Sequence, residues 1–232
     1  MRALLLAAGF GTRLKPLTDH VPKCLVDIHG KPLLQYWLEM LTESGVQDIL
    51  INTHYLPEKV TSFIENSAYH DSVKIVFEEQ LLGTGGTLLA NRDFFRNKPV
   101  LLIHADNLSK FDIAAFINAH RNRPTNTEIT MMTFDTDSPK TCGILELDGT
   151  GVVKAFHEKV ENPPGNLANG AVYIIESGVI DFLAKKGKTE IDFSNEVIPA
   201  YIGRIYTFHN NTYHRDIGNM ESYKKALNEY HW

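Results

Sequence analysis

The sequence predicts an α/β fold with a mixed, mostly parallel central sheet. Short apolar runs alternate with amphipathic helical patterns through the first half of the chain, an order that favours parallel strands covered by helices on both faces. The 232 residues are 43% hydrophobic and 22% charged, which is typical of a globular protein with a sizeable core. These observations indicate a Rossmann-like three-layer fold. The sequence shows no linker or internal repeat, which favours a single domain, 1–232.

The first half of the chain supplies the predicted alternation of strands and helices. The apolar run Met1–Ala8 is typical of a buried first strand, and apolar residues recur at helical spacing from Leu33 to Leu41, before Gly45. We predict further strands at 49–51, 73–77 and 100–103. We predict further helices near 57–66, 86–96 and 111–121.

From about residue 125 the elements become shorter and less regular. Residues 129–134 predict a strand, and 143–147 with 152–156 predict a hairpin around the turn formers Asp148-Gly149. Short strands and helices follow, and 222–230 predicts a closing helix.

Charge and cysteine content narrow the class of protein. The net charge of −5 disfavours a general nucleic-acid binder, so an anionic ligand has to meet a local cationic pocket. The two cysteines, Cys24 and Cys142, provide no disulfide framework and suit a reducing compartment. No apolar run approaches the roughly 18 residues of a membrane span. We therefore expect a cytoplasmic protein with neither a nucleic-acid nor a membrane partner.

A glycine turn after the first strand is the most specific motif in the chain. It consists of Ala7-Ala8-Gly9-Phe10-Gly11-Thr12-Arg13-Leu14-Lys15-Pro16-Leu17-Thr18, and Pro22-Lys23 follow. Glycines let backbone N–H groups approach an anion, and the flanking cations balance its charge. A dinucleotide fingerprint would need glycine where Leu14 stands, and a phosphate-binding P-loop would need Gly-Lys-Ser/Thr, which does not follow. The motif therefore indicates a different polyphosphate site.

This segment resembles the signature of the sugar-phosphate nucleotidyltransferases, also called nucleoside-diphosphate-sugar pyrophosphorylases. The elements Gly-x-Gly-Thr-Arg-Leu, Pro-Leu-Thr and Pro-Lys all occur in order. The resemblance implies that Arg13 neutralises the triphosphate and the departing pyrophosphate, and that Lys23 holds the reacting phosphates. It further implies substrate binding by the turn residues Ala8, Gly9, Gly11 and Thr12.

A second glycine-rich segment, Glu79-Gln80-Leu81-Leu82-Gly83-Thr84-Gly85-Gly86, lies between a predicted strand and helix. Gln80 offers a donor and an acceptor to a base edge, and glycine lets a flat base approach the backbone. Without the resemblance, the segment is equally well explained as a helix cap. The resemblance implies that Gln80 and Gly85 bind the base. The Leu-Gly-Thr-Gly-Gly form is most similar to mannose- and heptose-1-phosphate guanylyltransferases, which favours GTP.

Two carboxylates are the candidate metal ligands. Asp106 follows the predicted strand 100–103, where open α/β sheets place ligands. Asp216 lies in Asp-Ile-Gly near the end of the chain. The resemblance implies that both hold Mg²⁺, a cation that prefers such oxygen ligands. The chain has Ala105 where the family has glycine before the first aspartate.

The candidate sugar-binding residues lie between these motifs. Glu158-Lys159 resembles the family's Glu-Lys-Pro, with Val160 in place of proline, and the resemblance implies contacts to the sugar hydroxyls and phosphate. Asn169 occupies a family position that binds a sugar hydroxyl, and Gly143 one that packs against the sugar. Without the resemblance, Glu158 and Lys159 form an ordinary solvated pair at a strand end.

The resemblance as a whole implies magnesium-dependent transfer of a nucleotidyl group from an NTP to a sugar 1-phosphate of the mannose or manno-heptose type. It implies an NDP-sugar and pyrophosphate as products, with the NDP-sugar used in cell-surface polysaccharide synthesis. We expect nucleotide binding in about 1–125 and sugar-phosphate binding in about 126–232. Relatives often form dimers, so a homodimer is an expected assembly.

Two alternatives remain open from the sequence. One is a pyrimidine-specific enzyme, such as an N-acetylmuramate-1-phosphate uridylyltransferase or a phosphocholine cytidylyltransferase. The other is a catalytically silent regulatory subunit that binds nucleotide sugars. Such a subunit would be expected to lose some of the charged site residues, whereas this chain keeps Arg13, Lys23, Asp106 and Asp216.

Overall fold

The computed structural model describes residues 1–231. The chain forms two compact units. Unit 1 is built from Met1–Leu81, Ile103–Ile113 and the C-terminal segment that begins at Thr212. Unit 2 is built from Leu82–Leu102 and Ala114–Asn211. Each unit therefore combines segments that are distant in sequence. The expected division into a nucleotide part and a sugar-phosphate part near residue 125 stays a prediction.

The helices and strands have well-defined bounds. The helices are α1 Leu33–Glu43, α2 Pro57–Glu65, α3 Gly83–Ala90, α4 Arg92–Phe95, α5 Ile113–Arg121, α6 Ser177–Lys185, α7 Phe193–Glu196 and α8 Met220–Glu229. The strands are β1 Arg2–Leu6, β2 Asp27–Ile28, β3 Lys31–Pro32, β4 Asp48–Thr53, β5 Val73–Phe77, β6 Val100–His104, β7 Asn107–Lys110, β8 Ile129–Asp135, β9 Gly143–Leu147, β10 Val153–Glu158, β11 Leu167–Ile175, β12 Ile205–His209 and β13 Tyr213–Asp216.

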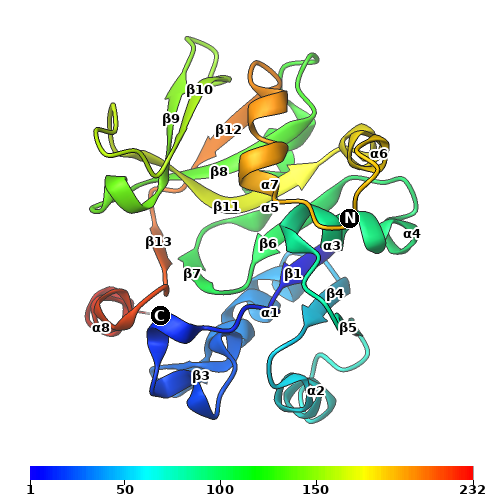
Figure 1. Ribbon diagram of the computed structural model, residues 1–232, viewed down its shortest axis with the longest axis vertical. Helices are drawn as coiled ribbons and strands as arrows, with labels where there is room; N and C mark the ends of the chain where they lie inside the picture. The colour runs from blue at the N-terminus through cyan, green and yellow to red at the C-terminus, as the bar shows by residue number, and fades with distance from the viewer. Residues whose placement is uncertain (232) are drawn as a thin grey trace. The chain divides into compact units, whose positions relative to one another are not determined.

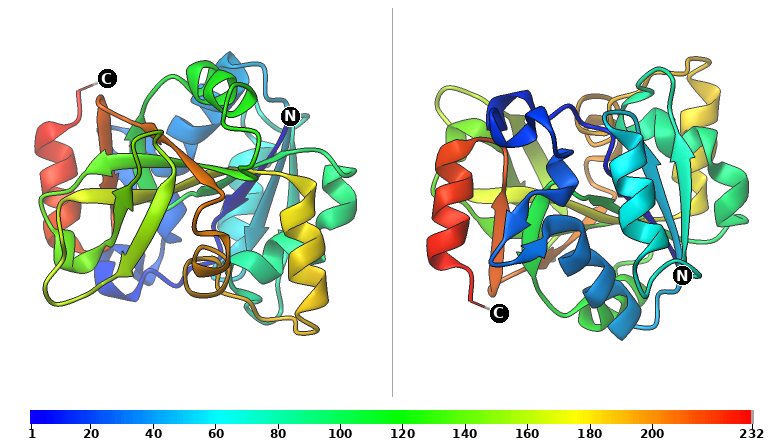
Figure 2. Two further views of the ribbon diagram at one scale, coloured as in Figure 1. Left: turned by 90° about the horizontal axis from the view of Figure 1, so that it is seen from above. Right: turned by 90° about the horizontal axis from the view of Figure 1, so that it is seen from below.

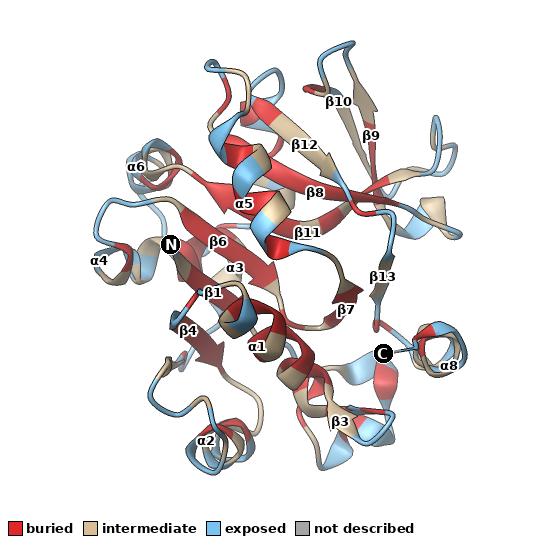
Figure 3. Cartoon of the chain, turned by 180° about the vertical axis from the view of Figure 1, so that it is seen from behind, coloured by how far each residue is buried: buried red, intermediate tan, exposed pale blue. Residues whose placement is uncertain are grey.

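In unit 1, β1, β4 and β5 form a parallel sheet (Figure 1). Leu4 pairs with Leu50 in the register of β1 and β4, and Leu50 pairs with Lys74 of β5. Apart from the half-buried Leu6, the apolar side chains of β1 and β4 are buried (Figure 3), as expected for parallel strands covered on both faces. Helix α2 connects β4 to β5 and packs beside β5 (Figure 2). Because parallel strands end at the same edge, the loops after β1, β4 and β5 meet there.

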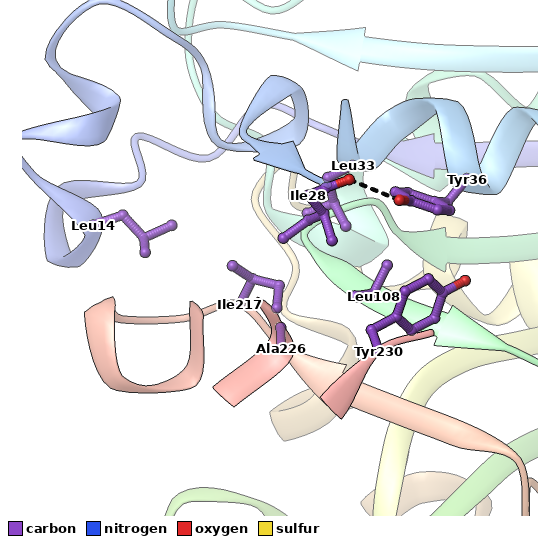
Figure 4. Close-up of a cluster of buried hydrophobic side chains, with 8 residues drawn as sticks. All are labelled: Leu14, Ile28, Leu33, Tyr36, Leu108, Ile217, Ala226 and Tyr230. Atoms are coloured by element: carbon purple, nitrogen blue, oxygen red, sulfur yellow. Dashed lines mark hydrogen bonds between the residues drawn. The ribbon is translucent and has the colours of Figure 1, made fainter. Parts of the chain in front are cut away.

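The C-terminal segment of unit 1 packs onto its N-terminal segment. Ile217, Ala226 and Tyr230 share a buried cluster with Leu14, Ile28, Leu33, Tyr36 and Leu108 (Figure 4). The Tyr36 hydroxyl donates a hydrogen bond to the Ile28 carbonyl at 2.7 Å, which satisfies its polar atom inside the cluster. This packing keeps the end of the chain beside the loop that follows β1.

In unit 2, β8 pairs in parallel with β12 and antiparallel with β11 (Figure 1). Strands β9 and β10 form an antiparallel pair, and β9 meets β11 where Ile144 pairs with Ala168. The predicted strand at 129–134 and the predicted hairpin at 143–156 are therefore confirmed.

The predicted helix at 86–96 is wrong in its extent, because the structure divides this region into α3 and α4. Helix α3 ends at Ala90, and the Asn91 amide caps it by donating to the Thr87 carbonyl at 2.9 Å. Helix α4 ends before Arg96, whose φ of 51° is left-handed. The other predicted helices and strands are present, with ends that differ by a few residues. In residues 1–231, no helix is long and apolar enough to cross a membrane.

Candidate active site

The glycine turn after β1 has one tightly packed glycine and one open glycine. Gly11 has a left-handed φ of +64°, and a Cβ there would lie 3.0 Å from Thr18 Cγ2 and 3.1 Å from Lys23 Cβ. Gly9 is exposed, and within the described chain a Cβ at this position would meet no atom within 4 Å. Gly11 therefore shapes the turn, while the backbone at Gly9 has an open face toward which a ligand can approach.

Buried polar side chains that the sequence did not single out hold this turn. The Ala7 N–H donates to Asn52 Oδ1 at 2.8 Å, and the Asn52 amide donates to the buried carboxylate of Glu78 at 3.0 Å. The Thr18 hydroxyl donates to the Gly11 carbonyl at 2.8 Å. The polar residue Asn52 within an apolar strand was the available signal, because a buried polar group needs a partner.

Three predicted catalytic or metal-binding residues come together in unit 1. Lys23 Nζ lies 2.7 Å from Asp106 Oδ2 and 3.3 Å from Asp216 Oδ1. The Lys23 side chain is only 9% exposed, whereas the side chains of Asp106 and Asp216 are 37% and 55% exposed. One buried ammonium group therefore links two carboxylates that remain open to solvent.

The charged groups of this cluster stabilise one another in their ionised forms. Burial alone would lower the pKa of Lys23, but the attraction of Asp106 and Asp216 and their hydrogen bonds outweigh it, so the pKa is raised. Burial alone would raise the pKa of Asp106, but Lys23 and, to a smaller extent, His104 lower it. Lys23 is therefore held as an ammonium ion and Asp106 as a carboxylate.

Strand pairing explains why two aspartates so distant in sequence meet. Strands β7 and β13 are antiparallel, with Asp216 opposite Asn107, and the Ile217 N–H donates to the Asp106 carbonyl at 3.2 Å. The Ala105 N–H donates to the Leu6 carbonyl at 3.0 Å, which fixes Asp106 beside the end of β1. Asp106 lies just beyond β6 rather than within it. Ala105 is buried and is not among the residues with a left-handed φ, so its backbone conformation does not require glycine.

The donor set of Asp106 and Asp216 fits a magnesium ion. Two carboxylates from neighbouring backbone segments supply hard oxygen ligands, and Mg²⁺ takes its remaining ligands from water and phosphate. Among residues 1–231 there is no group of three or more His, Cys, Asp or Glu side chains placed to hold a metal ion. A Mg²⁺ ion held by Asp106 and Asp216 would therefore need further ligands, such as water or phosphate oxygens.

Arg13 and Gln80 are also in unit 1 and are exposed. Arg13 lies in the short 3-10 helix Thr12–Leu14 that follows the glycine turn, next to the equally exposed Thr12. Within the described part of the chain, Arg13 forms no ion pair. Gln80 lies in the loop between β5 and α3. Both side chains are therefore free to contact a ligand, and their binding roles stay predictions.

Unit 2 brings together Gly143, Glu158 and Lys159. Gly143 pairs with Glu158 across β9 and β10, and a Cβ on Gly143 would lie 2.7 Å from Glu158 Oε2. Lys159 Nζ lies 3.1 Å from Glu158 Oε1, and Lys159 has a left-handed φ of 49°. The missing Cβ at Gly143 thus leaves room for the Glu158 carboxylate.

Asn169 lies on β11 and stabilises an irregularity in that strand. Its amide donates to the Tyr173 hydroxyl at 2.7 Å, and its Oδ1 accepts from the Ala171 N–H at 2.9 Å. Ala171 has a left-handed φ of 53°, within the interruption of the β11–β8 register. Asn169 therefore has a structural task, and its contact with a sugar stays a prediction.

Gly85 is packed against another segment of unit 2. Its N–H donates to the Ile191 carbonyl at 2.8 Å, and that of Gly86 donates to the same carbonyl at 3.2 Å. A Cβ on Gly86 would lie 2.1 Å from the Thr189 carbonyl oxygen. These glycines let the chain near Ile191 cover the first turn of α3. These contacts lie within the chain, so the role of Gly85 in base binding stays a prediction.

The family of the chain follows from comparison with known proteins. The model of the nucleotidyl transferase family matches residues 2–231, and the chain belongs to this family. A Bacillus anthracis structure assigned as a glucose-1-phosphate thymidylyltransferase has the same fold, with a TM-score of 0.88 and 20% identity over 100% of this chain and 97% of that one. The predicted α/β fold with a mixed, mostly parallel central sheet is thereby confirmed.

Particular relatives within the family are enzymes. The mannose-1-phosphate guanylyltransferase of Mycobacterium tuberculosis is 31% identical over 97% of this chain and 63% of its own length. A rice protein, probable mannose-1-phosphate guanylyltransferase 1, is 32% identical over 99% of this chain and 64% of its own length. The chain thus spans somewhat less than two thirds of these curated relatives. HddC from Yersinia pseudotuberculosis, solved in complex with GMP-PN, is 27% identical with a TM-score of 0.82, covering 98% of each chain.

Proposed function

We propose that this chain transfers a guanylyl group from GTP to the phosphate of a sugar 1-phosphate, of the mannose or manno-heptose type, with release of pyrophosphate. The cluster of Lys23, Asp106 and Asp216 beside the open glycine turn carries this proposal. The relatives named for mannose-1-phosphate guanylyl transfer, and the one solved with GMP-PN, support guanine and a manno-configured sugar.

The reaction joins two anions and forms no bond to the protein. An oxygen of the sugar phosphate attacks the α-phosphorus of GTP, and the bond from that phosphorus to the oxygen bridging to the β-phosphate breaks. Arg13 holds the β- and γ-phosphates and compensates the charge of the leaving pyrophosphate, because its guanidinium fork matches phosphate oxygens. Lys23 holds the reacting phosphates as a mobile point charge. Positioning and charge compensation are the protein's contributions in this kind of transfer.

Asp106 and Asp216 would hold Mg²⁺ in this scheme. The ion would supply charge neutralisation for the phosphates. Glu158 would accept hydrogen bonds from sugar hydroxyls, Lys159 would pair with the sugar phosphate, and Asn169 would bind a further hydroxyl. Gln80 and Gly85 would contact the base.

The test is pyrophosphate release across a grid of nucleoside triphosphates and 1-phosphates. The sugars include mannose, manno-heptose, glucose and N-acetylmuramate 1-phosphates, with phosphocholine as an additional acceptor. We expect magnesium-dependent release with GTP and a manno-configured sugar. Release with UTP or CTP only would instead support a pyrimidine-specific enzyme, and binding of nucleotide sugars without any release would support a regulatory subunit.

A further inference from the structure

The ion pairs of Lys23 involve the same carboxylate groups that the proposed function assigns to a metal ion. Lys23 Nζ is within hydrogen-bond distance of one oxygen of Asp106 and one oxygen of Asp216. Its side chain is 9% exposed, so these carboxylates replace water as partners of the ammonium group. A divalent cation bound to both carboxylates would lie next to a like charge.

We propose that Lys23 and a divalent cation compete for Asp106 and Asp216, so that the cation binds tightly only together with a nucleotide whose phosphates take over the Lys23 ammonium. This inference rests on the proposed function, because it assumes that both carboxylates are metal ligands. It adds to that function a task for Lys23, whose ammonium holds both carboxylates until a nucleotide arrives.

Charge pairing explains why tight binding of the cation is expected to depend on the nucleotide. A cation that arrives alone shares both carboxylates with the Lys23 ammonium and lies beside this like charge, so it weakens the pairing of a buried ammonium group, which is unfavourable. A cation that arrives with a triphosphate brings a partner for each charge: the cation pairs with the carboxylates, and a phosphate pairs with Lys23. Binding of the metal and of the nucleotide is then positively coupled, and the coupling is reciprocal.

The position of the Lys23 stem makes this exchange of partners geometrically simple. A Cβ built on Gly11 would lie 3.1 Å from Lys23 Cβ, so the lysine stem lies against the glycine turn that is expected to receive phosphates. The backbone of Lys23 is held in the short 3-10 helix Lys23–Leu25, with the Val26 N–H donating to the Lys23 carbonyl at 3.2 Å. Rotation about side-chain bonds can therefore move Nζ from the carboxylates toward the turn without moving the backbone.

The experiment measures the affinity of the nucleotide-free protein for Mn²⁺ by electron paramagnetic resonance. We compare the wild-type chain with Lys23→Met, which removes the charge, and Lys23→Arg, which keeps it. Lys31→Met is the matched control, because Lys31 forms a partly buried ion pair with Glu39 at 2.6 Å in the same unit. We expect Lys23→Met to bind Mn²⁺ about tenfold more tightly than wild type, within the usual range of coupling between sites. Lys23→Arg and Lys31→Met should bind Mn²⁺ as weakly as wild type.

Equal Mn²⁺ affinity in wild type and Lys23→Met would overturn the proposal, as would an equal gain in Lys23→Arg. Lys23→Gln serves as a second neutral variant if Lys23→Met does not fold. If neither neutral variant folds, the wild-type protein decides: Mn²⁺ binding that is as tight without nucleotide as with a non-hydrolysable GTP analogue contradicts the competition.

A further comparison separates this inference from the proposed function. Asp106→Asn and Asp216→Asn are titrated with Mn²⁺ in the presence of a non-hydrolysable GTP analogue. Loss of Mn²⁺ affinity in both variants supports the metal site on which the competition depends. Unchanged affinity in both would mean that these carboxylates are not metal ligands, which contradicts the metal assignment itself.

Discussion

Gly218 lies directly against the carboxylate of Asp216. A Cβ built on Gly218 would be 3.2 Å from Asp216 Cγ and only 2.6 Å from Asp216 Oδ2, and the second distance is closer than real Cβ atoms approach. The φ of Gly218 is not left-handed, so its backbone conformation would tolerate other residues. A side chain at this position would displace the carboxylate, because Asp216 Oδ2 occupies the space of its Cβ. The glycine of the Asp-Ile-Gly motif therefore sets the direction of the aspartate.

We expect Gly218→Ala to lower kcat about 10- to 100-fold, the range associated with displacing a catalytic group by about 1 Å. The Asp216 side chain is 55% exposed and can turn into solvent, so the melting temperature should change little. Steady-state kinetics and thermal unfolding measure the two effects separately.

Gly149→Ala is the matched control for this substitution. Gly149 has no left-handed φ, and in the described residues nothing lies within 4 Å of a Cβ built there. This variant should keep the wild-type kcat. An equally unchanged kcat in Gly218→Ala would show that the direction of Asp216 is unimportant for catalysis.

Arg13→Ala should reduce kcat/KM for the nucleotide by about 10²- to 10⁴-fold, as expected for loss of a charge contact made in the transition state. Arg13 is exposed and forms no ion pair in residues 1–231, so the fold should not depend on it. The melting temperature should equal that of wild type. Arg92→Ala removes another exposed arginine and should leave turnover unchanged. Full activity of Arg13→Ala would assign this arginine no part in the reaction.

Glu158→Gln should raise KM for the sugar 1-phosphate about tenfold, the cost of roughly one hydrogen bond to a charged group, and leave KM for the nucleotide unchanged. Glutamine keeps the size of the side chain, which sits close to Gly143. The measurement is a pair of saturation curves, one for each substrate. A rise in KM for the nucleotide alone would contradict the assignment of Glu158 to the sugar.

Gly143→Ala tests the space that Gly143 leaves for Glu158. Its Cβ would lie 2.5 Å from Phe156 Cε2 as well as 2.7 Å from Glu158 Oε2, so we expect both a higher KM for the sugar 1-phosphate and a lower melting temperature. Overpacking of this kind costs about 1–3 kcal/mol. Unchanged stability together with unchanged KM would mean that β9 and β10 adjust without displacing Glu158.

Local sequence patterns identified the parts of the site that depend on nearby residues. The glycine turn, Arg13 and Lys23 belong to one contiguous motif, and Asp106 follows an apolar run that is confirmed as β6. The conformation of Gly11 and the position of Asp106 after a strand follow from these short-range features.

Features that depend on contacts between distant segments could not be predicted from local sequence patterns. The meeting of Asp216 with Asp106 depends on the pairing of β13 with β7, which no local periodicity specifies. The hydrogen bond from the Gly85 N–H to the Ile191 carbonyl likewise depends on a segment about a hundred residues away. The sequence could suggest that Asp216 shares a site with Asp106 only through resemblance to the family.

His120 makes the stability of unit 2 dependent on pH. The side chain is buried; Nδ1 lies 2.8 Å from Thr130 Oγ1, and Nε2 lies 3.2 Å from Glu176 Oε1. Burial and the nearby Arg123 cation lower the pKa of His120 to about 4, although Glu176 opposes the shift. The imidazole is therefore neutral in the folded protein at pH values where an unfolded chain, with a histidine pKa near 6.5, already binds a proton.

The sign of the effect follows from this difference in proton uptake. Well above pH 6.5 neither state binds a proton at His120. As the pH falls from there toward 4, the unfolded state takes up the proton while the folded state does not, so stability is lost. Between pH 7 and pH 5 we expect His120 to reduce the free energy of unfolding by about 2 kcal/mol. Urea unfolding at both pH values measures this loss. His120→Gln should lower stability at pH 7 but show a smaller loss on acidification, whereas the exposed His70→Gln should follow wild type. An equal pH dependence in His120→Gln and wild type would show that other groups take up the proton, because only His120 differs between the two chains.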